Sequence, residues 1–62
     1  MKRRLHLVRA GDPRGVRDLD WVVRVGDPLL LEDRGTPPLP PGPIDHDQLV
    51  QLVFAADLVV TW

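Results

Sequence analysis

The sequence predicts a small α/β domain, a minimal three-stranded parallel sheet with two helices, formed as one unit by residues 1–62. Three short apolar runs have the length of strands, at residues 4–9, 28–33 and 58–62. Two stretches with the helical spacing of apolar residues lie between them. Strands that alternate with helices are joined by right-handed crossovers into parallel sheets, so the alternation predicts the fold class.

The first strand is predicted at residues 4–9, "RLHLVR", where apolar and polar side chains alternate. A helix is predicted next, because Asp12 followed by Pro13 offers an N-cap oxygen and then a residue whose missing N–H costs nothing at that position. Gly26 stands where a glycine would end this helix. The helix is further supported by apolar residues at helical spacing, namely Val16, Leu19, Val22 and Val23.

The stretch "WVVRV" at residues 21–25 allows a second interpretation. Its β-branched residues could form a strand that pairs with "LLLE" as a hairpin across Gly26, Asp27 and Pro28. The periodicity that begins at Val16 continues without a break through this stretch, and for that reason the helix is favoured.

Residues 28–33, "PLLLED", form a short apolar run of the kind that a buried strand shows. The following loop, "RGTPPLPPGP" at residues 34–43, holds five of the seven prolines. It is predicted to be neither a helix nor a central strand, and to run as an extended, polyproline-like surface loop. A ligand for a proline-recognition domain is one interpretation of this loop, and a stiff connector is the favoured one.

The second helix has clear end signals. Asp45 and Gln48 form a capping-box pair, and Ile44 and Leu49 stand at the positions of a hydrophobic staple. One apolar stripe follows, made of Leu49, Leu52, Val53 and Ala56. The last strand begins directly afterwards, at Leu58.

The small size of the chain points to partner subunits. A domain of 62 residues buries only about 60% of the surface that its unfolded chain exposes, and such domains are usually reinforced by disulfides, metals or oligomerisation. Disulfides are excluded because the sequence has no cysteine. We therefore expect a homo-oligomer, with closed two-fold symmetry as the commonest form.

The many prolines and the preference for arginine over lysine are typical of a thermophile or of a high-GC genome.

The charges are unevenly distributed although the net charge is only −1. All eight Lys and Arg residues lie in the first 34 positions, where acidic residues are mixed among them and no aromatic residues interleave in the manner of a nucleic-acid site. A salt-bridged surface is favoured over direct binding of nucleic acid. No apolar run is long enough for a signal peptide or a membrane span, so a cytoplasmic protein that does not bind membranes is expected.

The residues available for chemistry predict no catalytic residue, no cofactor and no metal ion. Serine and cysteine are absent, Thr61 lies inside a predicted strand, and Thr36 is in the proline-rich loop with no nearby base. His46 and Asp47 could be taken for metal ligands, but at the first helical positions their exposure and the helix dipole explain them. His6 is interpreted as a surface or satisfied core residue. The chain alone is therefore expected not to be an enzyme.

Three stretches in order, "LHLVR", "GDPLLLEDRG" and "IDHDQLVQLVFAADLVVTW", resemble the DsrH/TusB family. Members of that family open with a strand reading Leu-His, carry a "GD-x-LLLI-x-DG" second strand, and end on "IDY-x-x-FV-x-L" followed by a strand that finishes in Trp. The resemblance covers Leu5 to Arg9, Gly26 to Gly35 and Ile44 to Trp62. It implies a small parallel α/β fold of truncated DsrE/DsrH type that sits beside DsrE/DsrF-like, cysteine-bearing subunits in a persulfide relay for sulfur oxidation or tRNA 2-thiolation.

The chain also departs from the family pattern. A strand and helix between the second strand and the last helix are replaced by "TPPLPPGP", and His46 and Leu49 replace the usual Tyr and Phe. The cysteine that some members carry in the first helix has no counterpart near Leu19 to Trp21. Without a thiol the chain cannot hold a persulfide, so the resemblance implies a non-catalytic structural or regulatory subunit. The alternative is an independent small homo-oligomer of unrelated role, which binds RNA or a regulator through its arginine-rich half.

The last strand supplies the predicted interface. Strand alternation places Leu58, Val60 and Trp62 on one face, and tryptophan is enriched where interfaces have most of their binding energy. Trp62 is predicted to be a packing anchor, buried against the second helix or in a subunit interface. The candidate interface residues are Trp62, Trp21, Val60 and Leu58.

Overall fold

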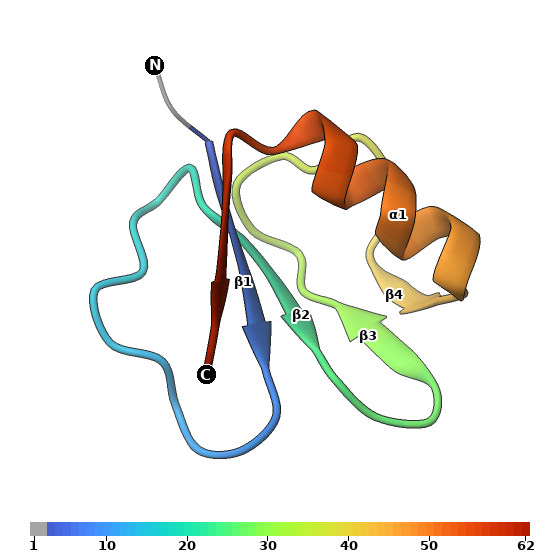
Figure 1. Ribbon diagram of the computed structural model, residues 1–62, viewed down its shortest axis with the longest axis horizontal. Coiled ribbons are helices and arrows are strands. Elements are labelled where there is room, and N and C mark those ends of the chain that lie inside the picture. The colour runs from blue at the N-terminus through green and yellow to red at the C-terminus, as the bar shows by residue number, and fades with distance from the viewer. Residues whose placement is uncertain (1–2) are drawn as a thin grey trace.

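The computed structural model describes residues 3–62 and contains a five-stranded sheet with one helix (Figure 1). The elements in chain order are β1 (Arg4–Val8), β2 (Trp21–Arg24), β3 (Leu29–Leu31), β4 (Gly42–Ile44), α1 (His46–Ala55) and β5 (Leu58–Thr61). The predicted α/β class is confirmed in its coarse form, as a small mixed domain. The finer prediction of three strands and two helices is wrong.

The first predicted helix does not form. Residues 9–20 make bends and one turn, and the stretch from Trp21 is strand β2. Gly15 lies inside the predicted helix with φ of 74°, a conformation that a right-handed helix cannot include. Val22 and Val23 are both buried, on opposite faces of the strand, as expected of a strand inside a sheet. The hairpin interpretation of residues 21–25 is therefore confirmed in place of the helix.

The sheet is mixed rather than parallel, with the strand order β4-β3-β2-β1-β5. β1 lies in the middle of the parallel part and pairs with both β2 and β5. β3 returns antiparallel to β2, and β4 is antiparallel to β3. The prediction of an all-parallel sheet fails at β3, because the connection from β2 to β3 is a short hairpin and has no room for a crossover.

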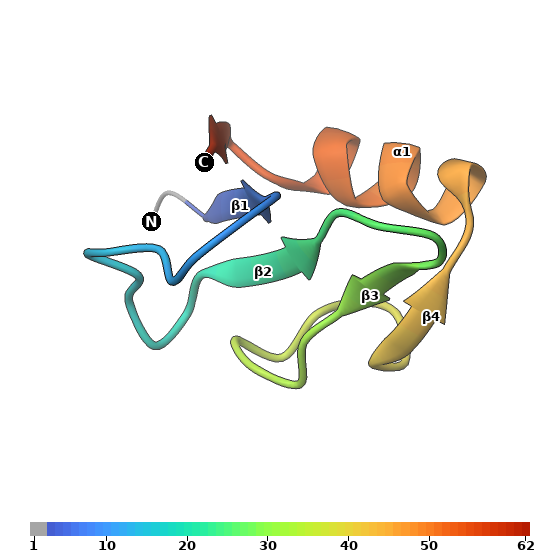
Figure 2. The ribbon, with the colours of Figure 1, turned by 90° about the horizontal axis from the view of Figure 1, so that it is seen from below.

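The apolar core lies on the face of the sheet that α1 covers (Figure 2). Its buried members are Leu5, Trp21, Val23, Leu31, Ile44 and Leu52. The opposite face holds Val8 and Val22 together with two buried polar residues, His6 and Asp20. Both faces of the central strands are thus covered, and the polar pair lies on the face away from the helix.

The second predicted helix and the last strand are confirmed. Asp45 accepts a hydrogen bond from the Gln48 amide at 2.8 Å, and the Gln48 side chain accepts one from the Asp45 amide at 3.0 Å, so both halves of the capping box are made. The end of the proline-rich loop contributes Gly42 and Pro43 to β4, an edge strand where proline is tolerated. Within residues 3–62 no helix has the length and apolar character needed to cross a bilayer.

Gly35 provides a test of the packing between the proline-rich loop and β2. It has φ of 72°, and a Cβ built there would lie 2.5 Å from the Asp20 carbonyl oxygen. Gly11 has almost the same φ, 73°, but nothing lies within 4 Å of its would-be Cβ. We expect Gly11→Ala to lower the free energy of unfolding by about 1 kcal/mol through backbone strain. Gly35→Ala should cost about 1–3 kcal/mol more because a backbone atom must move.

Urea unfolding followed by tryptophan fluorescence measures both variants against the parent chain. Equal losses for the two variants would contradict the close approach of Gly35 to Asp20.

Candidate functional site

Two charged or polar residues are buried side by side on the face away from α1. The register of β1 and β2 pairs Leu5 with Trp21 and His6 with Val22. Asp20 precedes Trp21 and therefore lies on the same face as His6 and Arg4. His6 is 2% and Asp20 3% exposed. A buried carboxylate is stable only when it is paired and hydrogen-bonded, so its partners define the site.

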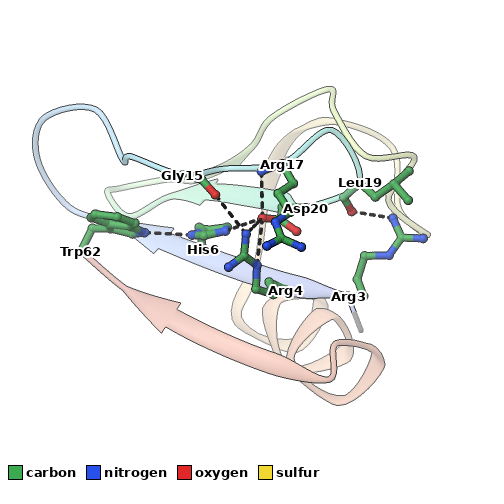
Figure 3. A network of polar contacts seen from close by, with 8 residues as sticks. All are labelled: Arg3, Arg4, His6, Gly15, Arg17, Leu19, Asp20 and Trp62. Atoms are coloured by element: carbon green, nitrogen blue, oxygen red, sulfur yellow. Dashed lines mark hydrogen bonds and ion pairs between the residues drawn. The ribbon is translucent and has the colours of Figure 1, made fainter. Parts of the chain in front are cut away.

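The polar contacts of the Asp20 side chain described here are all made by one carboxylate oxygen, Oδ2 (Figure 3). It accepts hydrogen bonds from Arg4 Nη2 at 2.9 Å and Nε at 3.2 Å, and from the Arg17 amide at 3.0 Å. His6 Nε2 lies 2.9 Å away from it. The segment between β1 and β2 is also fixed by Arg4, which donates to the Gly15 carbonyl at 3.0 Å. Asp20 thus joins β1, β2 and their connection.

His6 connects this carboxylate to the last residue of the sequence. The Trp62 indole Nε1–H donates to His6 Nδ1 at 2.9 Å (Figure 3). An indole N–H can only donate, so we assign Nδ1 as the unprotonated acceptor and place the imidazole proton on Nε2, facing Asp20. The two rings are also stacked, with centroids 6.0 Å apart. A continuous chain of donors and acceptors therefore runs from Trp62 through His6 to Asp20.

The pKa of Asp20 reflects these contacts. Burial raises it, but the hydrogen bonds from the Arg17 amide, His6 and Arg4, together with the charge of Arg4, outweigh burial and lower the pKa to about 2. The carboxylate is therefore ionised across the ordinary pH range, and the charge of Arg4 is compensated inside the fold.

A second polar cluster fixes the proline-rich loop to the sheet. The Gly35 carbonyl accepts hydrogen bonds from Trp21 Nε1 at 2.9 Å and from Arg3 Nη1. The Arg3 guanidinium also donates to the Leu19 carbonyl at 2.7 Å and lies 4.9 Å from the centre of the Trp21 ring, a cation–π distance. Trp21 is therefore a core residue with a satisfied N–H.

The predicted interface residues do not all lie together. Leu58, Val60 and Trp62 share one face of β5, as predicted, whereas Trp21 belongs to the core on the other face. Trp62 is 39% exposed and lies on His6 rather than against α1, because α1 covers the opposite face of the sheet. Its place in a subunit interface stays a prediction.

His6 and Thr36, which have groups that can act in catalysis, make contacts within the fold. His6 and Asp20 have the spacing of a base and its orienting carboxylate, but the histidine is buried and both of its ring nitrogens are engaged. Thr36 donates its hydroxyl hydrogen to the Gly35 carbonyl and not to this histidine.

An open cleft of about 330 Å³ lies between the β2–β3 hairpin and the start of α1, where His46 is found. Among residues 3–62 no three His, Cys, Asp or Glu side chains are grouped to hold a metal ion.

No family model, curated protein or solved structure matches this chain. The link to the DsrH/TusB family consequently rests on the three sequence stretches alone.

Sequence reasoning did not find the network of His6, Asp20 and Trp62. These residues are 14 and 56 positions apart, and only the parallel pairing of β1 with β2 and β5 brings them together. The available signal was the strand alternation, which puts His6 and Arg4 on the same face. Predicting Asp20 beside them required β2 to be assigned as a strand.

The low pKa of Asp20 predicts a loss of stability in acid. The pKa of this carboxyl group is 3.8 in the unfolded chain and about 2 in the folded one. Above about pH 4 the group is ionised in both states, and its ionisation stabilises the folded state. That contribution, about 2 kcal/mol, is lost as the pH falls through the folded pKa. Urea unfolding between pH 5 and pH 1.5 measures it. The control is Asp20→Asn, which should be less stable at pH 5 and have a shallower pH dependence; parallel curves would refute the assignment.

The contact between Trp62 and His6 can be isolated by a double-mutant cycle. Trp62→Phe keeps an aromatic ring but removes the N–H donor, and His6→Phe removes the acceptor. We expect a coupling free energy of about 1 kcal/mol from unfolding experiments, the typical net value of a hydrogen bond. A coupling of zero would mean that the indole N–H is satisfied by water.

Proposed function

We propose that this chain is a non-catalytic subunit of the DsrH/TusB type, which binds a cysteine-bearing DsrE/DsrF-like partner in a sulfur relay. The observation that carries the proposal is the position of its exposed apolar side chains. Three of the large hydrophobic residues that are exposed, Val50, Val53 and Phe54, lie on α1, in the stretch with the longest family resemblance. Exposed apolar side chains that lie together are typical of interaction surfaces.

Phe54 is the most prominent of these residues. It lies on α1 and is 84% exposed, with Val50 and Val53 exposed on the same helix. A helix that presents an aromatic residue beside aliphatic ones has the composition of a protein-binding surface, because aromatic anchors supply much of the binding energy. We therefore assign α1 as the surface for the cysteine-bearing partner.

The chemistry of the chain supports a structural part in such a complex. The sequence has no cysteine to accept sulfur and no serine. The one buried histidine that is described is held between Asp20 and Trp62. The persulfide would be carried by the partner, and this chain would position or regulate it.

Several arginines of the basic half are engaged within the fold, which disfavours the RNA-binding alternative. Arg4 pairs with Asp20, and Arg24 pairs with Glu32 at 2.9 Å and with Asp12 at 3.5 Å. Arg3 donates to two backbone carbonyls. Guanidinium groups satisfied in this way contribute less to a phosphate-binding surface.

The test is a reconstitution with a purified DsrE/DsrF-like protein, a cysteine desulfurase and sulfur-labelled cysteine. We expect the two chains to form a complex, with covalent label on the partner and none on this chain. Phe54→Asp should weaken the complex about tenfold or more, the effect of losing an interface anchor. The matched control is Leu19→Asp, which changes an exposed apolar residue outside α1 and should leave the affinity unchanged.

Label on this chain would contradict a non-catalytic role. Failure to bind the partner, with the chain folded by circular dichroism, would remove the sulfur-relay assignment altogether.

A further inference from the structure

Strand β5 forms an open edge of the sheet. Among residues 3–62 it pairs with β1 alone, and it lies at the end of the strand order. The Leu58 amide donates to the Arg3 carbonyl and the Trp62 amide donates to the Leu7 carbonyl, both on the β1 side. Because backbone groups alternate along a strand, the amide and carbonyl groups of Val59 and Thr61 point away from β1. Two residues therefore present four unpaired backbone groups on the open side.

The two edges of the sheet are protected differently. β4 is three residues long and contains Pro43, features that prevent a further strand from pairing. β5 reads Leu-Val-Val-Thr and has neither a charged residue nor a proline. An edge of this composition is a template for pairing with another strand.

We propose that two copies of this chain pair antiparallel through β5, with Val60 at the two-fold axis. In this register Val59 lies opposite Thr61 of the second copy, and each such pair exchanges two backbone hydrogen bonds. Both Val59–Thr61 pairs use the groups that point away from β1, so all four residues are satisfied. Leu58 lies opposite Trp62 of the second copy, on one face of the joined sheet.

The register centred on Val59 satisfies fewer of the outward-facing groups of Val59 and Thr61. Centring the pair on Val59 would place Asp57 opposite Thr61, but the Asp57 amide already donates to the Arg3 carbonyl at 2.8 Å. Of these two registers, the existing hydrogen bonds therefore select the one centred on Val60.

A second copy is the occupant that fits this edge. Four residues without charge offer no electrostatic feature for a different protein to recognise, and the register is self-complementary. Trp62 is held on its face by His6, while part of its indole stays exposed. Leu58 of the second copy would cover this exposed part, which converts two exposed side chains into a packed pair. The inference does not rest on the proposed function, because the isolated chain suffices to test it.

Single cysteines give the sharpest test, since the chain has none of its own. Val60→Cys places two thiols across the axis in a non-hydrogen-bonded pair, with Cα atoms about 4.5 Å apart, within disulfide range. Leu58→Cys is the matched control on the same face, because its two copies would be about 13 Å apart along the strands. Under mild oxidation we expect Val60→Cys to form covalent dimers at least about tenfold faster. The parent chain should show a monomer–dimer equilibrium by sedimentation.

Val59→Pro is a second variant that does not depend on cysteine chemistry. It removes an outward-facing amide and leaves the hydrogen bonds to β1 intact, so we expect a folded monomer. The inference is overturned if the parent chain is monomeric up to about 0.5 mM, far above the range in which specific interfaces assemble. It is equally overturned if Leu58→Cys crosslinks as fast as Val60→Cys, or if Phe54→Cys crosslinks faster, which would place the contact on α1.

Discussion

The buried carboxylate of Asp20 holds the parallel half of this sheet together. It accepts hydrogen bonds from two side chains of β1 and from the amide of Arg17, and it reaches β5 through His6 and Trp62. A carboxylate removed from water needs several donors, and each donor here comes from a different part of the chain or a different position along β1. The strands cannot separate without leaving that charge unpaired.

This network also specifies the strand register. Shifting β2 by one residue against β1 would move every side chain of β2 to the other face, and Asp20 would enter the apolar core beside Leu5. The shift would add no apolar contact for Leu5 and Trp21 to offset this burial of a charge, since the two residues already pack together in the core. A fully satisfied polar cluster of this kind contributes to specificity as well as to stability. For a domain without cysteines it performs a fastening role that disulfides often have in small folds.

The strands β1, β3 and β5 and the helix α1 were predictable from the sequence, whereas the segment between β1 and β3 was not. The strand at the start, the capping box of Asp45 and Gln48, and the last strand all have local signals. The helix predicted within residues 9–25 is wrong because apolar residues there repeat with helical spacing, namely Val16, Leu19, Val22 and Val23. In the structure Val22 and Val23 are buried on opposite faces of a strand. Helical periodicity and a strand buried on both faces give the same apolar pattern over so few residues. Once β2 was missed, the position of Asp20 beside His6 could not be derived.

The difference between the two sheet edges limits how this protein can assemble. A sheet whose two edge strands are both open permits endless head-to-tail growth. Here one of the edge strands, β4, is protected from pairing by Pro43 and by its short length. Within residues 3–62 β5 is the edge left open, and when it pairs with β5 of a second copy about a two-fold axis, neither copy keeps an open edge there. The hydrogen bond from Trp62 to His6 fixes the end of that strand before any partner arrives, which lowers the entropy lost on pairing. The carboxylate of Asp20 that sets the internal register thus also orders, through His6 and Trp62, the edge strand through which we propose that the sheet is extended.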